Sequence, residues 1–267
     1  MQKESKETDE EIIKRKGMMA VDRKKQTMER LRSSEAVYVL MSGGTKLPYV
    51  ICDPDTYDDQ ILVFFKEEDA RKRMAGLAAE KNPVQVIKVE KKSFLMFYTS
   101  LYPMGVNCIV ANDGTLDRAA VQLNELIVRN NPDRLPEGQV WVENPALNLT
   151  AIYFMQELYK NRGQAMTEEM KELYEEMMAH LGRGRYIFAA RKDEGVLALK
   201  GRDGQLYQPL FTDIQEFGKF NRQNQFRAVV VEADKVLNLI PAGSAGIVLN
   251  PLGVNVQLKI ARASQDQ

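Results

Sequence analysis

The chain has 267 residues, of which 44% are hydrophobic and 28% are charged, and its 37 basic side chains balance its 37 acidic ones. Such a composition is typical of a folded globular protein, and the length suits one large domain or two ordinary ones. Because there is no basic excess to bind phosphates, nucleic acid is not the expected partner.

Residues 1–35 are rich in Lys, Arg and Glu and show no clean apolar stripe. They predict a charged tail followed by a helix from about Asp22 to Ser33. No apolar run reaches the roughly 18 residues that span a bilayer. The N-terminus is charged where a secretory signal would be apolar. We therefore expect a cytoplasmic protein without a membrane segment.

Residues 36–114 predict a first α+β module. Apolar alternation and turn residues indicate strands at 36–43, 47–53, 60–65, 84–91 and 107–113. A helix is predicted over 66–81, where Ala70, Met74 and Leu77 recur at helical spacing and acidic residues occupy the first turn.

Residues 115–182 do not repeat this pattern and predict a helical insert. Apolar residues from Leu116 to Ile127 fit one helix. Asn144 and Pro145 have the N-cap and first-turn chemistry of a second. Thr167 begins a third helix, which ends near Gly182. The insert also gathers methionines, which fill cores but also suit adaptable binding surfaces, so a partner groove would be sought here.

Residues 183–262 predict a second module with the same order of elements. Strands are expected at 185–192, 195–201, 205–211, 227–234, 245–253 and 254–260. Turns at 193–195 and 203–204 indicate hairpins. Thr212 and Gln215 match a capping box, which places a helix start at Thr212.

The two modules carry one pattern twice. In each, a strand leads through a Phe (Phe65 or Phe211) into a helix, and a later apolar strand ends at an Asn (Asn112 or Asn250). The sequence thus predicts an α+β fold of two homologous mixed modules with a helical insert between them. A duplicated module also argues against a single catalytic centre.

The second module resembles the SseB family, named for enhanced serine sensitivity. The residues that carry the resemblance are Pro209, Phe211, Thr212, Asn250, Pro251 and Gly253. The first module departs from the pattern, with Val63, Phe65 and Lys66 at the Pro, Phe and Thr places. The resemblance implies an α+β fold, and it implies no established enzymatic activity and no cofactor.

Few residues offer catalytic or metal chemistry. The single His180 lies near a helix end, where it would interact with the helix dipole, and nothing in the sequence places Cys52 or Cys108 beside it. Both cysteines are expected to be reduced, buried strand residues, with a disulfide or redox pair as the alternative. Two cysteines and one histidine cannot form a four-ligand zinc site, so no cofactor or metal is expected.

Two loops are rich in residues that ligand-binding motifs use. The acidic turn at Asp53, Asp55, Asp58 and Asp59 lacks the Gly and Glu of a calcium-binding loop, which leaves a solvated turn or a weak cation site. The glycine-rich residues 42–46 have the wrong spacing for a phosphate-binding loop.

These observations favour a non-catalytic binding or scaffold protein whose partner is a protein or peptide. The six residues that resemble the SseB family are candidates for the binding surface, although a helix entry and a tight turn would also explain them. The alternative is a hydrolase or transferase with a carboxylate-lined cleft between the modules. A weaker alternative is RNA binding through clustered Lys and Arg.

Overall fold

A computed structural model gives the fold of the chain. It describes residues 9–129, 135–136, 139–191, 195–201, 203–241 and 243–260. The hairpin turn expected at 193–195 therefore lies largely outside the described residues.

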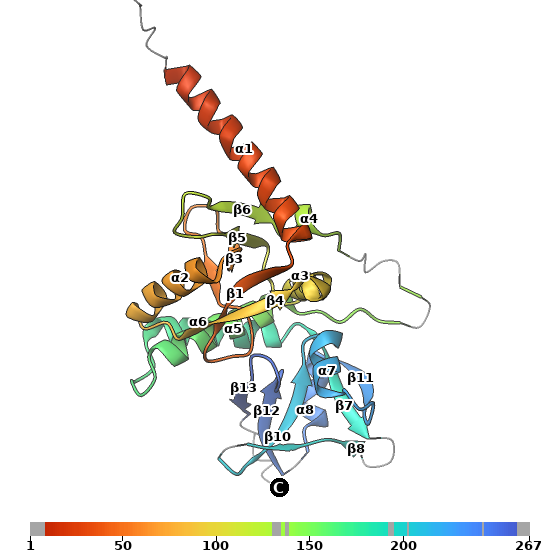
Figure 1. The fold of residues 1–267 in the computed structure, drawn as a ribbon. Coiled ribbons are helices and arrows are strands. Elements are labelled where there is room, and N and C mark those ends of the chain that lie inside the picture. Colours follow the sequence, from red (N-terminus) through yellow and green to blue (C-terminus); the bar gives the residue numbers. More distant parts are fainter. Residues whose placement is uncertain are drawn as a thin grey trace, which may run out of the picture.

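A long helix and a six-stranded mixed sheet form the N-terminal part (Figure 1). The strand order is β4-β1-β3-β5-β6, and β2 pairs with β3 at one end. The strands are β1 (Ala36–Ser42), β2 (Val50–Cys52), β3 (Asp59–Phe64), β4 (Val84–Glu90), β5 (Cys108–Ala111) and β6 (Ala119–Gln122). The helices are α1 (Asp9–Ser33), α2 (Glu67–Ala79), α3 (Phe94–Leu101) and α4 (Leu123–Leu126).

Two helices, α5 (Pro145–Lys160) and α6 (Glu168–Leu181), then lead to a second mixed sheet. Its order is β11-β7-β10-β12-β13, with β8 beside β7 and β9 beside β10. The strands are β7 (Arg185–Arg191), β8 (Gly195–Val196), β9 (Leu199–Lys200), β10 (Leu206–Phe211), β11 (Arg227–Glu232), β12 (Ser244–Leu249) and β13 (Val256–Lys259). The helices are α7 (Ile214–Phe220) and α8 (Ala233–Leu239).

The two sheets have the same topology. In both, the central pair β3/β5 or β10/β12 is parallel, while the neighbouring pairs are antiparallel. A helix follows the central strand (α2 or α7), and another follows the edge strand (α3 or α8). The predicted fold class is confirmed: the protein is α+β, with two similar strand modules and helices between them.

The strand register corrects the sequence alignment of the modules by one residue. Asn112 donates its N–H to Val63 O, and Asn250 donates its N–H to Leu210 O. Val63 therefore corresponds to Leu210, so Phe64 rather than Phe65 corresponds to Phe211. Local sequence similarity could not fix this register, because two phenylalanines stand side by side.

The equivalent asparagines share an unusual backbone conformation. Asn112 has φ +53° and Asn250 has φ +44°, in the left-handed region that asparagine tolerates better than most residues. In each, the side-chain Oδ1 accepts a backbone N–H from the residue that begins the helix entry, Phe65 or Thr212. This shared device links the end of one strand to the start of a helix.

One hydrophobic cluster extends through both modules. It joins residues such as Val39 and Ile109 of the first sheet to Leu210 and Ile247 of the second through α5 and α6. The opposite faces of the sheets have smaller clusters under α2 and α7. The two sheets thus share one core on the side that faces the helices between them.

Helix α5 connects the modules through buried polar side chains. The Gln156 side chain donates to Val50 O and accepts from Val50 N, both at 2.9 Å. It thus supplies hydrogen-bond partners to the backbone groups on the outer edge of β2. Tyr153 donates to Asp59 Oδ1 at 2.6 Å. Asn148 donates to Pro103 O at 3.1 Å, and its own Oδ1 lies 3.4 Å from Asn250 Nδ2. Most of these bonds join α5 to the first module, and the contact between Asn148 and Asn250 joins it to the second.

Several element predictions were wrong. The N-terminal helix begins at Asp9 instead of near Asp22, and Figure 1 shows it extending away from the first sheet. The helix expected between Leu116 and Ile127 is strand β6 followed by the single turn α4, because β5 needs an antiparallel partner there. Helices α3 and α8 were not predicted.

The first sheet therefore runs past residue 114, to Gln122. We retain the division into a tail of residues 1–35, modules at 36–114 and 183–262 and an insert at 115–182 as a proposal, with this extension of the first module.

Candidate functional site

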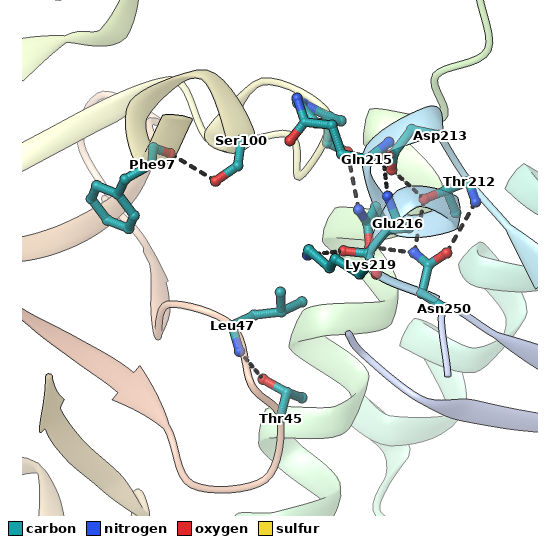
Figure 2. A network of polar contacts seen from close by, with 12 residues as sticks. Thr45, Leu47, Phe97, Ser100, Thr212, Asp213, Gln215, Glu216, Lys219 and Asn250 are labelled. Carbon is teal, nitrogen blue, oxygen red and sulfur yellow. Dashed lines mark hydrogen bonds and ion pairs between the residues drawn. The ribbon is translucent and has the colours of Figure 1, made fainter. Parts of the chain in front are cut away.

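The six residues singled out from the sequence lie around the start of α7. Asn250 Oδ1 accepts a hydrogen bond from the backbone N–H of Thr212 at 3.0 Å, and Asn250 Nδ2 donates one to Thr212 Oγ1 at 2.8 Å (Figure 2). Thr212 in turn donates its hydroxyl to Asp213 Oδ2 at 2.7 Å. Since Thr212 and Asn250 are fully buried, each of these bonds is shielded from competing water.

The observed start of α7 differs from the start that the predicted capping box gave. Asp213, not Thr212, is the N-cap of α7, and its Oδ1 accepts the N–H groups of Gln215 and Glu216, both at 2.9 Å. The carboxylate also lies at the positive end of the helix dipole. Phe211 packs edge-on against Phe217, with ring centroids 5.5 Å apart, and so holds the strand to the first helical turns.

A buried carboxylate lies beneath the turn after Asn250. Glu216 is 4% exposed, and its Oε1 pairs with the ammonium group of Lys219. Burial raises the pKa of the Glu216 carboxyl above its usual value of 4.5, and Lys219 opposes the rise. A methyl group on Gly253 would lie 2.5 Å from Glu216 Oε2, so the buried carboxylate would have to shift to make room for any other residue.

These residues are mostly inside the protein. Pro209, Phe211, Thr212, Asn250 and Gly253 are buried, and Pro251 is half-buried. They bring Leu252 and Lys219 to the surface, where both line an open groove.

The groove lies between the two modules and has a volume of about 1180 Å³. The first module contributes the loop at Lys46, the end of β4 and helix α3, while α7 and Leu252 come from the second. In Figure 2, α3 and the loop with Thr45 and Leu47 lie across from the α7 network. Leu95 and Met96 of α3 are each 72% exposed, so the groove has an apolar surface without a partner among the described residues.

The charged side chains that line the groove are mostly basic. They are Lys46, Lys88, Lys219 and Arg222, against a single acid, Glu90. Glu90 pairs with Lys92 at 2.8 Å, and Lys219 pairs with Glu216. Lys46, Lys88 and Arg222 form no ion pair within the described ranges, so the groove carries a positive potential.

Sequence reasoning identified Asn144 only as a helix cap and missed Asn148, although both bond to segments that are distant in the sequence. Asn144 does begin α5, but its side chain does not cap the helix: Nδ2 donates to Arg185 O at 2.6 Å and to Thr212 O at 2.8 Å. Asn148 lies on the buried face of α5, and a polar residue within that apolar stripe was the available signal.

The groove does not bring carboxylates together. Glu90 is the one acid among its described lining residues, whereas a carboxylate mechanism requires two converging groups. His180 lies on α6 with Nε2 3.3 Å from Glu176 Oε1. The cysteines are free, and Cys52 is exposed, which corrects the expected burial; Cys108 is buried, and burial raises its thiol pKa to about 11.

In the acidic turn after β2, the carboxylates of Asp53 and Asp58 accept hydrogen bonds from other groups of the protein. Asp53 Oδ1 accepts the N–H groups of Asp55 and Thr56, and Asp58 accepts from the side chains of Asn107 and Gln122. Across the described part of the chain, no three Asp, Glu, His or Cys side chains gather in a way that could hold a metal ion. No described helix is both long and apolar enough to cross a membrane.

The structure is that of an α+β protein with two similar modules and an open groove between them. Residues 157–262 match the family model described as the SseB protein N-terminal domain. This part of the chain is therefore similar to that domain, which confirms the resemblance seen in the second module. The match does not include the first module, so a second SseB copy there is not confirmed.

Two solved structures, both of Tic22, are similar to the chain. Anabaena Tic22, titled as a protein transport structure, is 15% identical over 80% of this chain and 84% of that chain, with a TM-score of 0.21. Tic22 from Plasmodium falciparum is 13% identical over 78% and 84%, also with a TM-score of 0.21. The chain has no match among curated proteins.

Proposed function

We propose that this chain is a non-catalytic binding or scaffold protein and that its partner is a protein or peptide held in the groove between the modules. The observation that carries the proposal is the pair of exposed side chains Leu95 and Met96 within a polar-rimmed groove. Apolar surface of this kind, rimmed by polar residues, is typical of protein–protein contact sites. A small-molecule enzyme would instead present converging titratable groups.

In this proposal the six SseB-like residues act indirectly. Asn250 and Thr212 hold the entry to α7, and Gly253 leaves room for Glu216, so that Lys219 and Leu252 line the groove. A cytoplasmic location is part of the same proposal, and the two free cysteines suit a reducing compartment.

Comparative capture from native lysate tests the proposal. A tagged wild-type chain is compared with a Leu95→Asp/Met96→Asp variant, and bound proteins are identified by mass spectrometry. We expect a partner that the wild type retains and the double variant loses. Leu116→Asp is the matched control, because Leu116 is 92% exposed and does not line the groove.

If wild type and double variant retain the same proteins, the groove is not the binding site. If the wild type releases a bound small molecule and no partner protein, the hydrolase or transferase alternative is favoured.

A further inference from the structure

Strand β4 has a free edge that lies in the groove. It stands at the end of the first sheet and, within the described ranges, pairs with β1 alone. Such an edge presents backbone N–H and C=O groups that can pair with another chain.

The register shows which groups are free. At the two ends of the β1/β4 ladder, Lys91 N donates to Glu35 O and Gly43 N donates to Pro83 O. Because inward and outward pairs alternate along an antiparallel ladder, the odd-numbered residues of β4 bond to β1. The backbone groups of Val86, Lys88 and Glu90 therefore point away from the sheet.

The groove follows this edge. Its lining includes three consecutive β4 residues, 88 to 90, whose side chains alternate between the two faces of the sheet. A groove over one face would meet alternate residues only. The exposed Leu95 and Met96 of α3 lie in the same groove, as do Lys219 of α7 and Arg222, which follows that helix.

We propose that the groove binds an extended acidic segment of a partner protein, which adds to the first sheet as a further strand along β4. The backbone of the segment pairs with Lys88 and its neighbours, its apolar side chains contact Leu95 and Met96, and its carboxylates face Lys46, Lys88 and Arg222. This inference rests on the proposed function, since it specifies the occupant of the same groove.

An extended occupant fits better than a helical one. A helix satisfies its own backbone groups and would leave those of β4 without partners, whereas an added strand pairs with them directly. The charges favour acid on the occupant, because Lys46, Lys88 and Arg222 have no ion-pair partner among the described residues. A second copy of β4 is a less complementary occupant than an acidic segment, because it would add its own Lys88 to a groove that is already basic.

Binding of synthetic peptides to the full chain tests the proposal. The probe is a fluorescently labelled peptide of about eight residues that alternates Glu with Val, a length typical of one strand. One control peptide has Lys in place of Glu, and another has alternate backbone amides N-methylated on the edge that would face β4. We expect the parent peptide to bind and each control to lose about tenfold or more in affinity.

Proline variants of β4 provide the matched test in the protein. Lys88→Pro removes an outward N–H and should leave the β1 ladder intact, whereas Ile87→Pro removes an inward one and should destabilise the sheet. Relative to Lys88→Ala, which removes the same charge, Lys88→Pro should lose about a further tenfold in peptide affinity with an unchanged circular dichroism spectrum. Bound peptide should also protect the amides of Val86, Lys88 and Glu90 from hydrogen exchange.

Several results would overturn strand addition. They are failure of the Glu–Val peptide to bind, equal affinity for the N-methylated peptide, or Lys88→Pro binding as well as Lys88→Ala. Tighter, competing binding of a single-stranded oligonucleotide would replace the acidic peptide with nucleic acid as the ligand. None of these affects the capture result with Leu95→Asp/Met96→Asp, so failure of this inference remains distinguishable from failure of the proposed function.

Discussion

At the scale of single residues, buried polar side chains determine how the second module is built. Asn250 satisfies both the N–H and the hydroxyl of Thr212, and Asp213 satisfies two N–H groups of α7. An unpaired buried donor or acceptor costs about 1–3 kcal/mol, so each of these side chains has a defined structural role. Their identities were visible in the sequence, but their roles were partly misassigned, because neighbouring Thr and Asp residues can both cap a helix.

The close approach of Gly253 to Glu216 makes a substitution there costly. Gly253→Ala would place a methyl group 2.5 Å from Glu216 Oε2, and overpacking of this kind costs about 1–3 kcal/mol. Urea unfolding should show this loss. Gly218→Ala is the control, because Gly218 lies on α7 and an added methyl group there would meet no neighbouring atom within 4 Å. This variant should gain about 0.5–1 kcal/mol in the free energy of unfolding, since alanine favours a helix more than glycine does.

The clash can be assigned to one partner by a double-mutant cycle. Glu216→Ala removes the carboxylate, so Gly253→Ala should cost less in that background. Equal costs in both backgrounds would contradict the assigned contact.

Glu216 should also make stability depend on pH. Burial raises the pKa of its carboxyl in the folded state above 4.5, so the folded protein holds this proton more tightly than the unfolded chain. The contribution is fully present below pH 4.5 and is lost as pH rises through the folded-state pKa. Wild type should therefore lose stability relative to Glu216→Gln as the pH rises.

Urea unfolding of both proteins from about pH 4 to pH 8 measures this difference, because titrations common to the two cancel. A difference that stays constant with pH would show that the Glu216 pKa is not raised by folding.

At the scale of elements, the local sequence pattern predicted most strands and helices. Strands β1 and β3 and helix α2 fall where alternation and helical spacing placed them. Thr167 caps α6 as expected, since its Oγ1 accepts the N–H of Met170 at 3.2 Å. The predictions failed at β6, where apolar residues fit a helix equally well and only the neighbouring strand β5 decided the outcome.

Helix α5 shows how an element can complete a sheet edge with a side chain. The Gln156 amide accepts the N–H of Val50 and donates to its C=O. Gln156→Glu would keep the acceptor but place a carboxylate against a carbonyl oxygen in a site that is 7% exposed. We expect a loss of about 1–3 kcal/mol at neutral pH in chemical denaturation.

The loss should shrink at low pH. A buried carboxylate facing a carbonyl has a raised pKa, and its protonated form donates to Val50 O as the amide does. Gln156→Leu is the comparison, because its effect should not change with pH. A pH-independent cost for Gln156→Glu would contradict the bidentate arrangement.

At the scale of the whole molecule, the common hydrophobic core should make the modules unfold together. Ile152 of α5 is fully buried in the cluster that joins both sheets. Ile152→Ala should lower the free energy of unfolding by about 2–5 kcal/mol. The unfolding midpoint should fall equally whether it is followed by Trp141 fluorescence or by far-ultraviolet circular dichroism.

The single tryptophan makes this test selective. Trp141 lines a cavity with Tyr102 of the first module and Val230 of the second, so its emission reports contact between them. Two separate transitions, or a shift in one signal alone, would show that the modules unfold independently.

The sequence by itself determined the two α+β modules, most of their elements and the residues of the SseB-like pattern. These follow from periodicity and turn chemistry within short segments, which are local properties of the chain. Only the tertiary structure decided the one-residue register between the modules, the bridging roles of Asn144 and Asn148, and the basic groove along β4. Those features depend on which distant surfaces meet, and that is set by the packing of both sheets against α5 and α6.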